Sequence, residues 1–115
     1  MKQTKETVST TAARPRNAVD RLAELCPAAA DAHRALRKSV LGSGPLDAHT
    51  CELIVLGGFV TARIESGFKA HAKRLLDDGV SREAIRQAVL VTLGATTSFP
   101  VAMEALRWVD EIEGG

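Results

Sequence analysis

The segment that most constrains the fold runs from Asp47 to about Arg63 and contains the letters ELIVLGGFV. On a helical projection its apolar residues lie nearly all round the axis, which is typical of a buried central helix and not of a surface helix. Asp47 suits the N-cap, because its carboxylate can accept the free backbone N–H groups of the first turn. Gly57 and Gly58 lower the helix propensity, and the simplest explanation is another helix packed closely against them.

Apolar residues at helical spacing indicate further helices on both sides of this segment. The loop GSGP at 42–45 separates the segment from what precedes it. Gly79 is placed to end a helix in the left-handed conformation, and Ser81 suits the N-cap of the next one. The predicted helices begin near Pro15, Ala28, Asp47, Gly67, Ser81 and Phe99, with breaks at 26–27 and 64–67 and a last helix ending near Ile112. The expected fold is all-α: a compact single domain of about six helices over residues 15–115, after a flexible tail at 1–14.

Composition agrees with this fold and excludes several classes of function. Only 3% of the residues are aromatic, so the core must come from small aliphatic side chains, which favours helix packing over a β-sandwich. Fifteen basic residues against fourteen acidic ones give no strong field for nucleic acid or an anionic membrane. The longest apolar stretch, 53–62, is about half of the roughly 20 residues that a membrane span needs. With no signal-peptide pattern, a cytoplasmic location with reduced thiols is expected.

Glu52 is the most informative ionisable residue, because it lies where the apolar run begins. Val55, Phe59 and Ala62 share its side of the helix. A carboxylate in apolar surroundings can be tuned to act as a general acid or base. The alternative interpretation is structural: a carboxylate in the first turns of a helix opposes the dipole or pairs with an arginine.

His71 lies on the apolar side of its own predicted helix, between Phe68 and Leu75. An isolated histidine in such a position is more often a satisfied core residue than a catalyst. The helices that carry Glu52 and His71 are consecutive and joined by a short break, so they are expected to pack antiparallel. Glu52 lies far before that break and His71 soon after it. The sequence therefore predicts that the two side chains are separated, unless a bent helix or another subunit brings them together.

Other polar residues give weaker signals. Glu65 and Lys69 are one turn apart, which predicts an exposed i, i+4 ion pair. Cys51 has no visible activating partner, so inert packing is expected for its thiol. The three histidines lack the spacing of a metal site, and no metal motif is present, so no metal is expected.

Several motifs follow one another in order along the chain: Leu46-Asp47, Glu52-Leu53-Ile54, His71, GVSREAI at 79–85, Phe99-Pro100 and AMEAL at 102–106. Together they resemble the carboxymuconolactone decarboxylase superfamily, which includes the alkylhydroperoxidase D proteins. The resemblance implies a compact helical fold, assembly into trimers or hexamers, and sites near subunit contacts. In the alkylhydroperoxidase D branch a C-x-x-C pair opens the helix with the histidine, and a glutamate on the preceding helix completes a proton relay.

The resemblance places that glutamate at Glu52 and the two cysteines at Ile64 and Gly67. Neither position holds a thiol, so dithiol peroxidase chemistry is not expected. The decarboxylase branch uses neither redox cysteines nor a cofactor, which fits these residues better. A full decarboxylase substrate site is not matched.

The leading hypothesis is a cofactor-free acid–base enzyme of the decarboxylase, lyase or isomerase type, acting on a small organic acid, lactone or carbonyl compound. His71 moves a proton, Glu52 sets its tautomer or shares the proton, and Glu65 is a third participant. One alternative is a non-catalytic binding or assembly module that keeps the oligomer. A weaker alternative is thiol-dependent peroxidase activity through Cys51.

Overall fold

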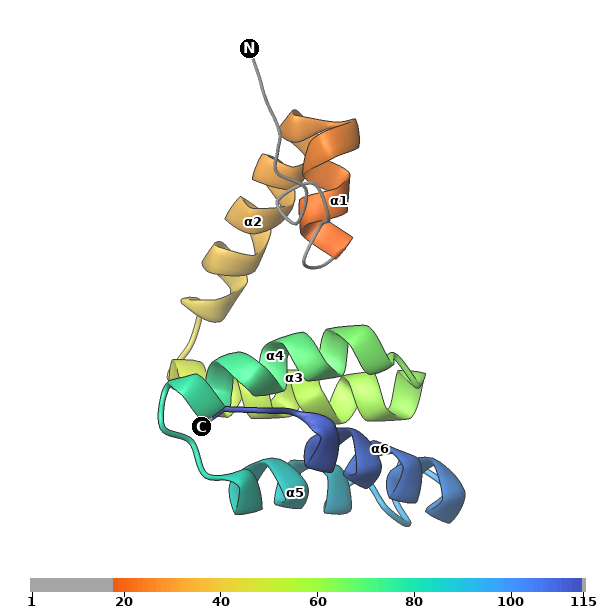
Figure 1. The fold of residues 1–115 in the computed structure, drawn as a ribbon. Helices are drawn as coiled ribbons and strands as arrows, with labels where there is room; N and C mark the ends of the chain where they lie inside the picture. Colours follow the sequence, from red (N-terminus) through yellow and green to blue (C-terminus); the bar gives the residue numbers. More distant parts are fainter. Residues whose placement is uncertain (1–17, 115) are drawn as a thin grey trace. The chain divides into compact units, whose positions relative to one another are not determined.

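The structure is a computed structural model, and it describes residues 18–114 (Figure 1). Its helices are α1 (Ala18–Leu25), α2 (Pro27–Leu41), α3 (Ala48–Ala62), α4 (Glu65–Asp77), α5 (Arg82–Leu90) and α6 (Phe99–Glu111). Within this part of the chain, strand-like pairing is limited to one bridge between Leu93 and Thr97. The all-α fold class and the number of helices are therefore confirmed. The predicted tail, residues 1–14, lies outside the described residues.

The described residues fall into two compact units that divide between Val40 and Leu41. The first holds α1 and nearly all of α2. Pro27 opens α2, a position where its missing N–H is not needed. Asp20 of α1 and Arg34 of α2 form an ion pair with an O–N distance of 3.5 Å, which links the two helices.

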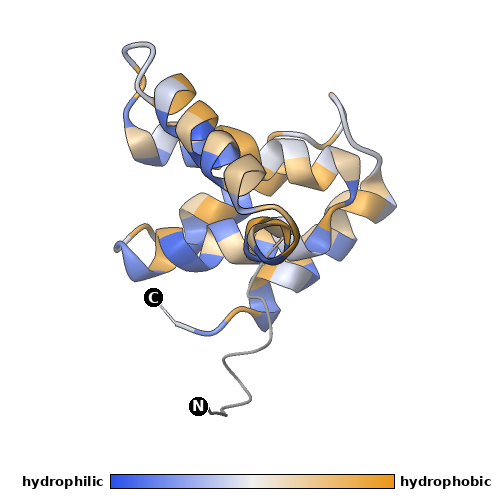
Figure 2. Ribbon diagram, turned by 90° about the horizontal axis from the view of Figure 1, so that it is seen from above, coloured by the Kyte–Doolittle hydropathy of each residue, from blue (hydrophilic) through white to orange (hydrophobic). Residues whose placement is uncertain are grey.

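The second unit is built from α3, α4, α5 and α6. α3 packs against α4, α5 and α6, and α6 also packs against α4 and α5. Figure 1 shows α3 beside α4, with α5 and α6 alongside one another below them. Hydrophobic and hydrophilic residues both occur on the helices of the structure (Figure 2).

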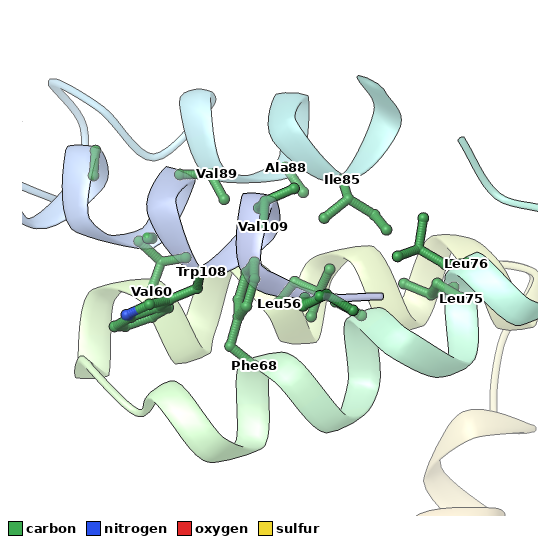
Figure 3. Packing of buried hydrophobic residues seen from close by; sticks show 14 residues of the cluster. Leu56, Val60, Phe68, Leu75, Leu76, Ile85, Ala88, Val89, Trp108 and Val109 are labelled. Carbon is green, nitrogen blue, oxygen red and sulfur yellow. The ribbon is translucent and has the colours of Figure 1, made fainter. Parts of the chain in front are cut away.

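The core of this unit lies between the four helices (Figure 3). Its largest fully buried side chains are aliphatic apart from Phe68 and Trp108, whose rings lie 5.6 Å apart between centroids. Of the few aromatic residues in the chain, two thus fill the centre, where a large side chain fits between small neighbours. The remaining core residues include Leu56, Val60, Leu75, Leu76, Ile85, Ala88, Val89 and Val109.

The expected helix ends at Asp47, Gly79 and Ser81 are confirmed. The Thr50 backbone N–H donates to Asp47 Oδ1 at 2.8 Å, and this bond holds the pKa of the Asp47 carboxyl below its usual value. The Ala84 N–H donates to Ser81 Oγ at 3.1 Å. Gly79 has a φ of 95°, a conformation that glycine adopts without steric cost.

The predicted break at 64–67 is shorter in the structure. α3 ends at Ala62, its C-cap Arg63 adopts the left-handed conformation with φ 61°, and α4 already begins at Glu65. Gly67 therefore lies inside the first turn of α4 and does not break the helix. The chain reverses direction over Arg63 and Ile64 alone, which holds α3 and α4 close together from the start.

Among the described residues, no helix is both long and apolar enough to cross a membrane.

Candidate functional site

Glu52 and His71 are in direct contact. His71 Nδ1 lies 2.5 Å from Glu52 Oε1, so the expectation that antiparallel packing separates them is wrong. Glu52 lies eleven residues before Arg63, and His71 lies seven residues after Ile64. The four-residue difference corresponds to about 6 Å of helical rise, which two extended side chains can span. The two-residue reversal is what keeps this difference small.

The pair is partly shielded from solvent. The exposed fractions of the side chains are 20% for Glu52 and 22% for His71. The ring of Phe59, about two turns after Glu52 on the same face of α3, lies 5.1 Å from the His71 ring between centroids, tilted by 52°. Arg74 Nη2 lies 3.0 Å from His71 Nδ1 and 4.0 Å from Glu52 Oε2. The site is therefore a carboxylate and an imidazole with an aromatic ring on one side and a guanidinium on the other.

The chemistry of these groups assigns the proton on the imidazole. An ionised carboxylate only accepts hydrogen bonds and a guanidinium only donates them. With Glu52 ionised, His71 Nδ1–H donates to Oε1, and Arg74 then contributes through its charge and not through a hydrogen bond to the ring. Among the described residues Nε2 has no hydrogen-bond partner. The lone pair of the imidazole thus lies on Nε2, the position from which a base works.

Glu65 lies in a different set of contacts. Its carboxylate forms the expected i, i+4 ion pair with Lys69, at 2.7 Å, and Lys69 Nζ also donates to Glu111 at 2.7 Å. Hydrogen bonding to Glu111 and Glu65 raises the pKa of Lys69, and the bond from Lys69 lowers the pKa of Glu111. Among the described residues, Glu65 makes no contact with Glu52 or His71, so the structure does not bring the three predicted site residues together.

An open groove lies on the opposite side of α3. It has a volume of about 750 Å³ and lies between α3 and α5. Its lining includes Leu53, Ile54, Gly57, Gly58, Ala88 and Val91, and neither Glu52 nor His71 belongs to it. The sequence analysis did not predict this groove. The expectation that α3 is buried all round is wrong for this face, because Ile54 is 60% exposed.

The two glycines of α3 differ in their surroundings. A Cβ at Gly57 would lie 3.4 Å from Thr92 Cγ2 and 3.8 Å from the Ala88 carbonyl oxygen. The C-terminal end of α5 does lie beside Gly57, but a Cβ would make only ordinary van der Waals contacts there, so helix packing does not require a glycine. A Cβ at Gly58 would meet nothing within 4 Å. Close packing therefore does not explain Gly58 either.

Comparison with known families identifies the fold unit that carries this site. The model of the carboxymuconolactone decarboxylase family matches residues 27–111, which include α2 to α6 and both members of the Glu52–His71 pair. This protein belongs to the carboxymuconolactone decarboxylase family. Searches of curated proteins and of solved structures found no match.

Within this family member, the two positions where the alkylhydroperoxidase D branch has cysteines are used differently. Ile64 is the N-cap of α4 and is 45% exposed. At Gly67, an added Cβ would lie 2.5 Å from Phe59 Cε1 and 2.7 Å from Phe59 Cζ. The Phe59 ring therefore occupies the space that any side chain at position 67 would need. Because position 67 is a glycine, the Phe59 ring can pack against the backbone of α4 next to the imidazole of His71.

The two thiols of this carboxymuconolactone decarboxylase family protein lie at other positions. Cys26 and Cys51 are both free, and Cys26 is exposed in the first unit. The Cys51 thiol is half-buried and donates to the Leu46 carbonyl oxygen at 3.8 Å. The described residues also contain no group of three or more side chains that could hold a metal ion.

Sequence reasoning missed Arg74 and the packing role of Phe59. Arg74 lies one turn after His71 on α4, so the i, i+3 spacing was a usable signal for a cation beside the imidazole. Phe59 was placed on the side of α3 that carries Glu52, but its contact with His71 depends on the missing side chain of Gly67.

Proposed function

We propose that this protein is a cofactor-free acid–base enzyme of the decarboxylase, lyase or isomerase type, acting on a small organic acid, lactone or carbonyl compound. The observation that carries the proposal is the 2.5 Å contact between Glu52 Oε1 and His71 Nδ1. A carboxylate bound to one imidazole nitrogen orients the ring and favours proton uptake at the other nitrogen. Membership of the carboxymuconolactone decarboxylase family supports the same class of chemistry.

In this proposal His71 is the base. Nε2 accepts a proton from a carbon atom next to a carbonyl group of the substrate, and the electron pair of that C–H bond moves toward the carbonyl oxygen. Glu52 holds the Nδ1–H and stabilises the imidazolium that forms. The imidazolium then returns the proton to the substrate, at the same carbon or at a neighbouring carbon. In decarboxylation the C–COO⁻ bond breaks in place of the C–H bond: its electron pair moves toward the carbonyl oxygen, carbon dioxide leaves, and an imidazolium already protonated from water delivers its proton to that carbon. These three outcomes correspond to exchange, isomerisation and decarboxylation.

Arg74 is the proposed group for binding an acidic substrate. Its side chain is 57% exposed, and its guanidinium lies next to the imidazole. A guanidinium binds a carboxylate through two parallel hydrogen bonds, which would fix the substrate relative to Nε2. Glu65, 49% exposed and paired with Lys69, stays a predicted third participant.

The remaining predictions from the resemblance belong to this proposal. They are a small-molecule substrate, assembly into a trimer or hexamer with sites near subunit contacts, a cytoplasmic location, and catalysis without a cofactor or metal.

The test measures proton transfer directly. Small lactones and β-keto acids are incubated with the full-length protein in deuterium oxide, and exchange at carbon and turnover are followed by proton NMR. His71→Ala should reduce the rate by about 10²- to 10⁴-fold. Glu52→Gln should reduce it less, and Glu65→Gln tests the third participant. His49→Ala is the matched control, since His49 is an exposed histidine paired with Asp78. Full activity in both His71→Ala and Glu52→Gln would overturn the proposal.

The binding or assembly module remains the alternative, and the uncharged groove on the far side of α3 is the observation that favours it. It predicts binding of panel compounds without exchange or turnover. Thiol-dependent peroxidase activity through Cys51 predicts peroxide consumption that Cys51→Ser abolishes.

A further inference from the structure

The groove between α3 and α5 is an apolar surface without an occupant in its own unit. Ile54 on α3 is 60% exposed, and Val91, directly after α5, is 65% exposed. Large apolar side chains gathered around a groove are uncommon on a monomer surface and mark a contact site. The apolar residues that surround α3 on all sides in the sequence thus differ in how they are covered. Leu56 and Val60 are buried in the core, Leu53 lines the groove but is half-buried against the core, and Ile54 is open at the groove.

No contact within its own unit explains why position 58 in the groove is a glycine. Gly58 is exposed, and a side chain there would meet nothing within 4 Å. Glycine weakens a helix interior, so a glycine without an internal packing reason is costly. A hollow at this position is explained if a side chain from outside the unit enters it.

The groove carries both a protruding and a hollow position on the same helix. Ile54 and Gly58 are four residues apart on α3, so they lie one above the other on one face. If a second α3 packs antiparallel across a two-fold axis that crosses the helix midway between them, Ile54 of each copy enters the hollow at Gly58 of the other. The face is therefore complementary to itself.

Charge favours the same occupant. None of the side chains that line the groove is charged. In a two-fold contact each residue near the axis meets identical residues, so a charged face would repel its copy. An uncharged face also offers nothing to a charged partner such as nucleic acid.

We propose that the groove face of α3 and α5 is the contact between two copies of this chain, packed about a two-fold axis with α3 against α3. The proposal goes beyond the acid–base function and does not depend on it. A two-fold contact of this kind occurs in a dimer or in a hexamer of two trimers, and is absent from a lone trimer.

The experiment measures the mass of the full-length protein by sedimentation over a wide range of concentration. The wild-type protein should sediment as a dimer or hexamer. Ile54→Glu should lower the mass by at least half and raise the dissociation constant about thirtyfold or more. Gly58→Ala, which fits its own unit without a clash, should raise the dissociation constant by about tenfold. Phe99→Glu is the matched control: Phe99 is 64% exposed but lies outside the groove, so its replacement should leave the mass unchanged.

Mixing two variants tests the register. Ile54→Glu and Gly58→Lys should each weaken the assembly when alone. In the mixture, the carboxylate introduced at position 54 of one copy meets the ammonium group introduced at position 58 of the other. The second 54–58 pair of the same contact keeps the native Ile54 and Gly58. The mixture should therefore assemble again, as a mixed species.

Three results would overturn the proposal. A monomeric wild-type protein would show that another segment of the same chain, or a small apolar ligand, covers the groove. An assembly that Ile54→Glu leaves intact would place the subunit contact elsewhere. A mixture that stays dissociated would exclude the antiparallel α3 register. Circular dichroism of each variant confirms that the helices are retained, because Ile54 and Gly58 are not part of the buried core.

Discussion

The two sides of α3 have similar apolar sequence but different surroundings. On one side Leu56 and Val60 are fully buried, and Phe59 packs beside the Glu52–His71 pair. On the other side Ile54 is largely exposed above an open groove. Hydrophobicity therefore shows that a face needs cover, but not whether that cover comes from the same chain. The Glu52–His71 pair lies on the side of α3 that the same chain covers. The uncharged groove lies on the other side, where we propose that a second copy of the chain packs.

The largest expected effect compares one residue from each side. Leu56→Ala should lower the free energy of unfolding by about 3 kcal/mol, because it leaves a cavity in a closed core. Ile54→Ala should lower it by less than about 0.5 kcal/mol when measured below the assembly concentration, because the side chain is mostly in water already. Urea denaturation of both variants measures the difference. Equal losses would show that the groove side is covered within the chain.

A second comparison uses the glycines. Gly67→Ala should destabilise the fold by about 1–3 kcal/mol, since its methyl group meets the Phe59 ring. Gly58→Ala should stabilise the isolated chain by up to about 1 kcal/mol through helix propensity. Thermal denaturation at low protein concentration measures both. The same sign for both substitutions would contradict the assignment of the two sides.

Phe59 contacts both Gly67 and the imidazole of His71. A double-mutant cycle measures how strongly residues 59 and 67 depend on each other. Phe59→Leu and Gly67→Ala should be coupled by about 0.5 kcal/mol or more, because the smaller side chain at 59 leaves room for the methyl group at 67. The NMR chemical shifts of the His71 ring protons should change in Phe59→Leu and not in Ile54→Ala, because the Phe59 ring lies next to the imidazole. Additive effects and unchanged chemical shifts would remove Phe59 from the positioning of His71.

The smallest expected effect concerns the N-terminal end of α3, which is common to both sides of the helix. The pKa of Asp47 is lower in the folded chain than its unfolded value near 3.8. The ionised cap therefore adds to the free energy of unfolding above that pH, and this contribution is lost as the pH falls through the lower pKa of the folded chain. Asp47→Asn keeps a capping side chain but removes the titration. Stability measured from about pH 5 downward should therefore fall less steeply in Asp47→Asn than in the wild type. Identical slopes would show that the cap does not titrate with folding.

Local signals predicted the helices well. Asp47, Ser81 and Gly79 mark ends because capping and left-handed conformations depend on the residue itself. The start of α4 was misplaced because a non-glycine residue, Arg63, takes the left-handed turn, while Gly67 serves packing. A turn of this kind depends on the contacts of the folded chain and leaves no mark in composition.

The members of the candidate site were named individually from the sequence, and their catalytic role stays a prediction. Glu52 and His71 were identified from their apolar neighbours and from the family resemblance, and family membership is confirmed. Their contact was not predicted, because it depends on the length of the reversal between α3 and α4 within two residues. The groove was not predicted either, because periodicity identifies an apolar face without identifying what lies against it.

The short reversal at Arg63 and Ile64 has a consequence for how this protein forms. Glu52 and His71 are 19 positions apart, and both lie in one continuous helical hairpin. Contacts of such low sequence separation close quickly, because little loop entropy is lost. We therefore expect the pair to assemble in an early, local folding event, before α6 packs against the hairpin. Destabilising substitutions in α5 or α6 should then lower the amount of folded protein. In the molecules that do fold, the arrangement of Glu52 and His71 should be unchanged.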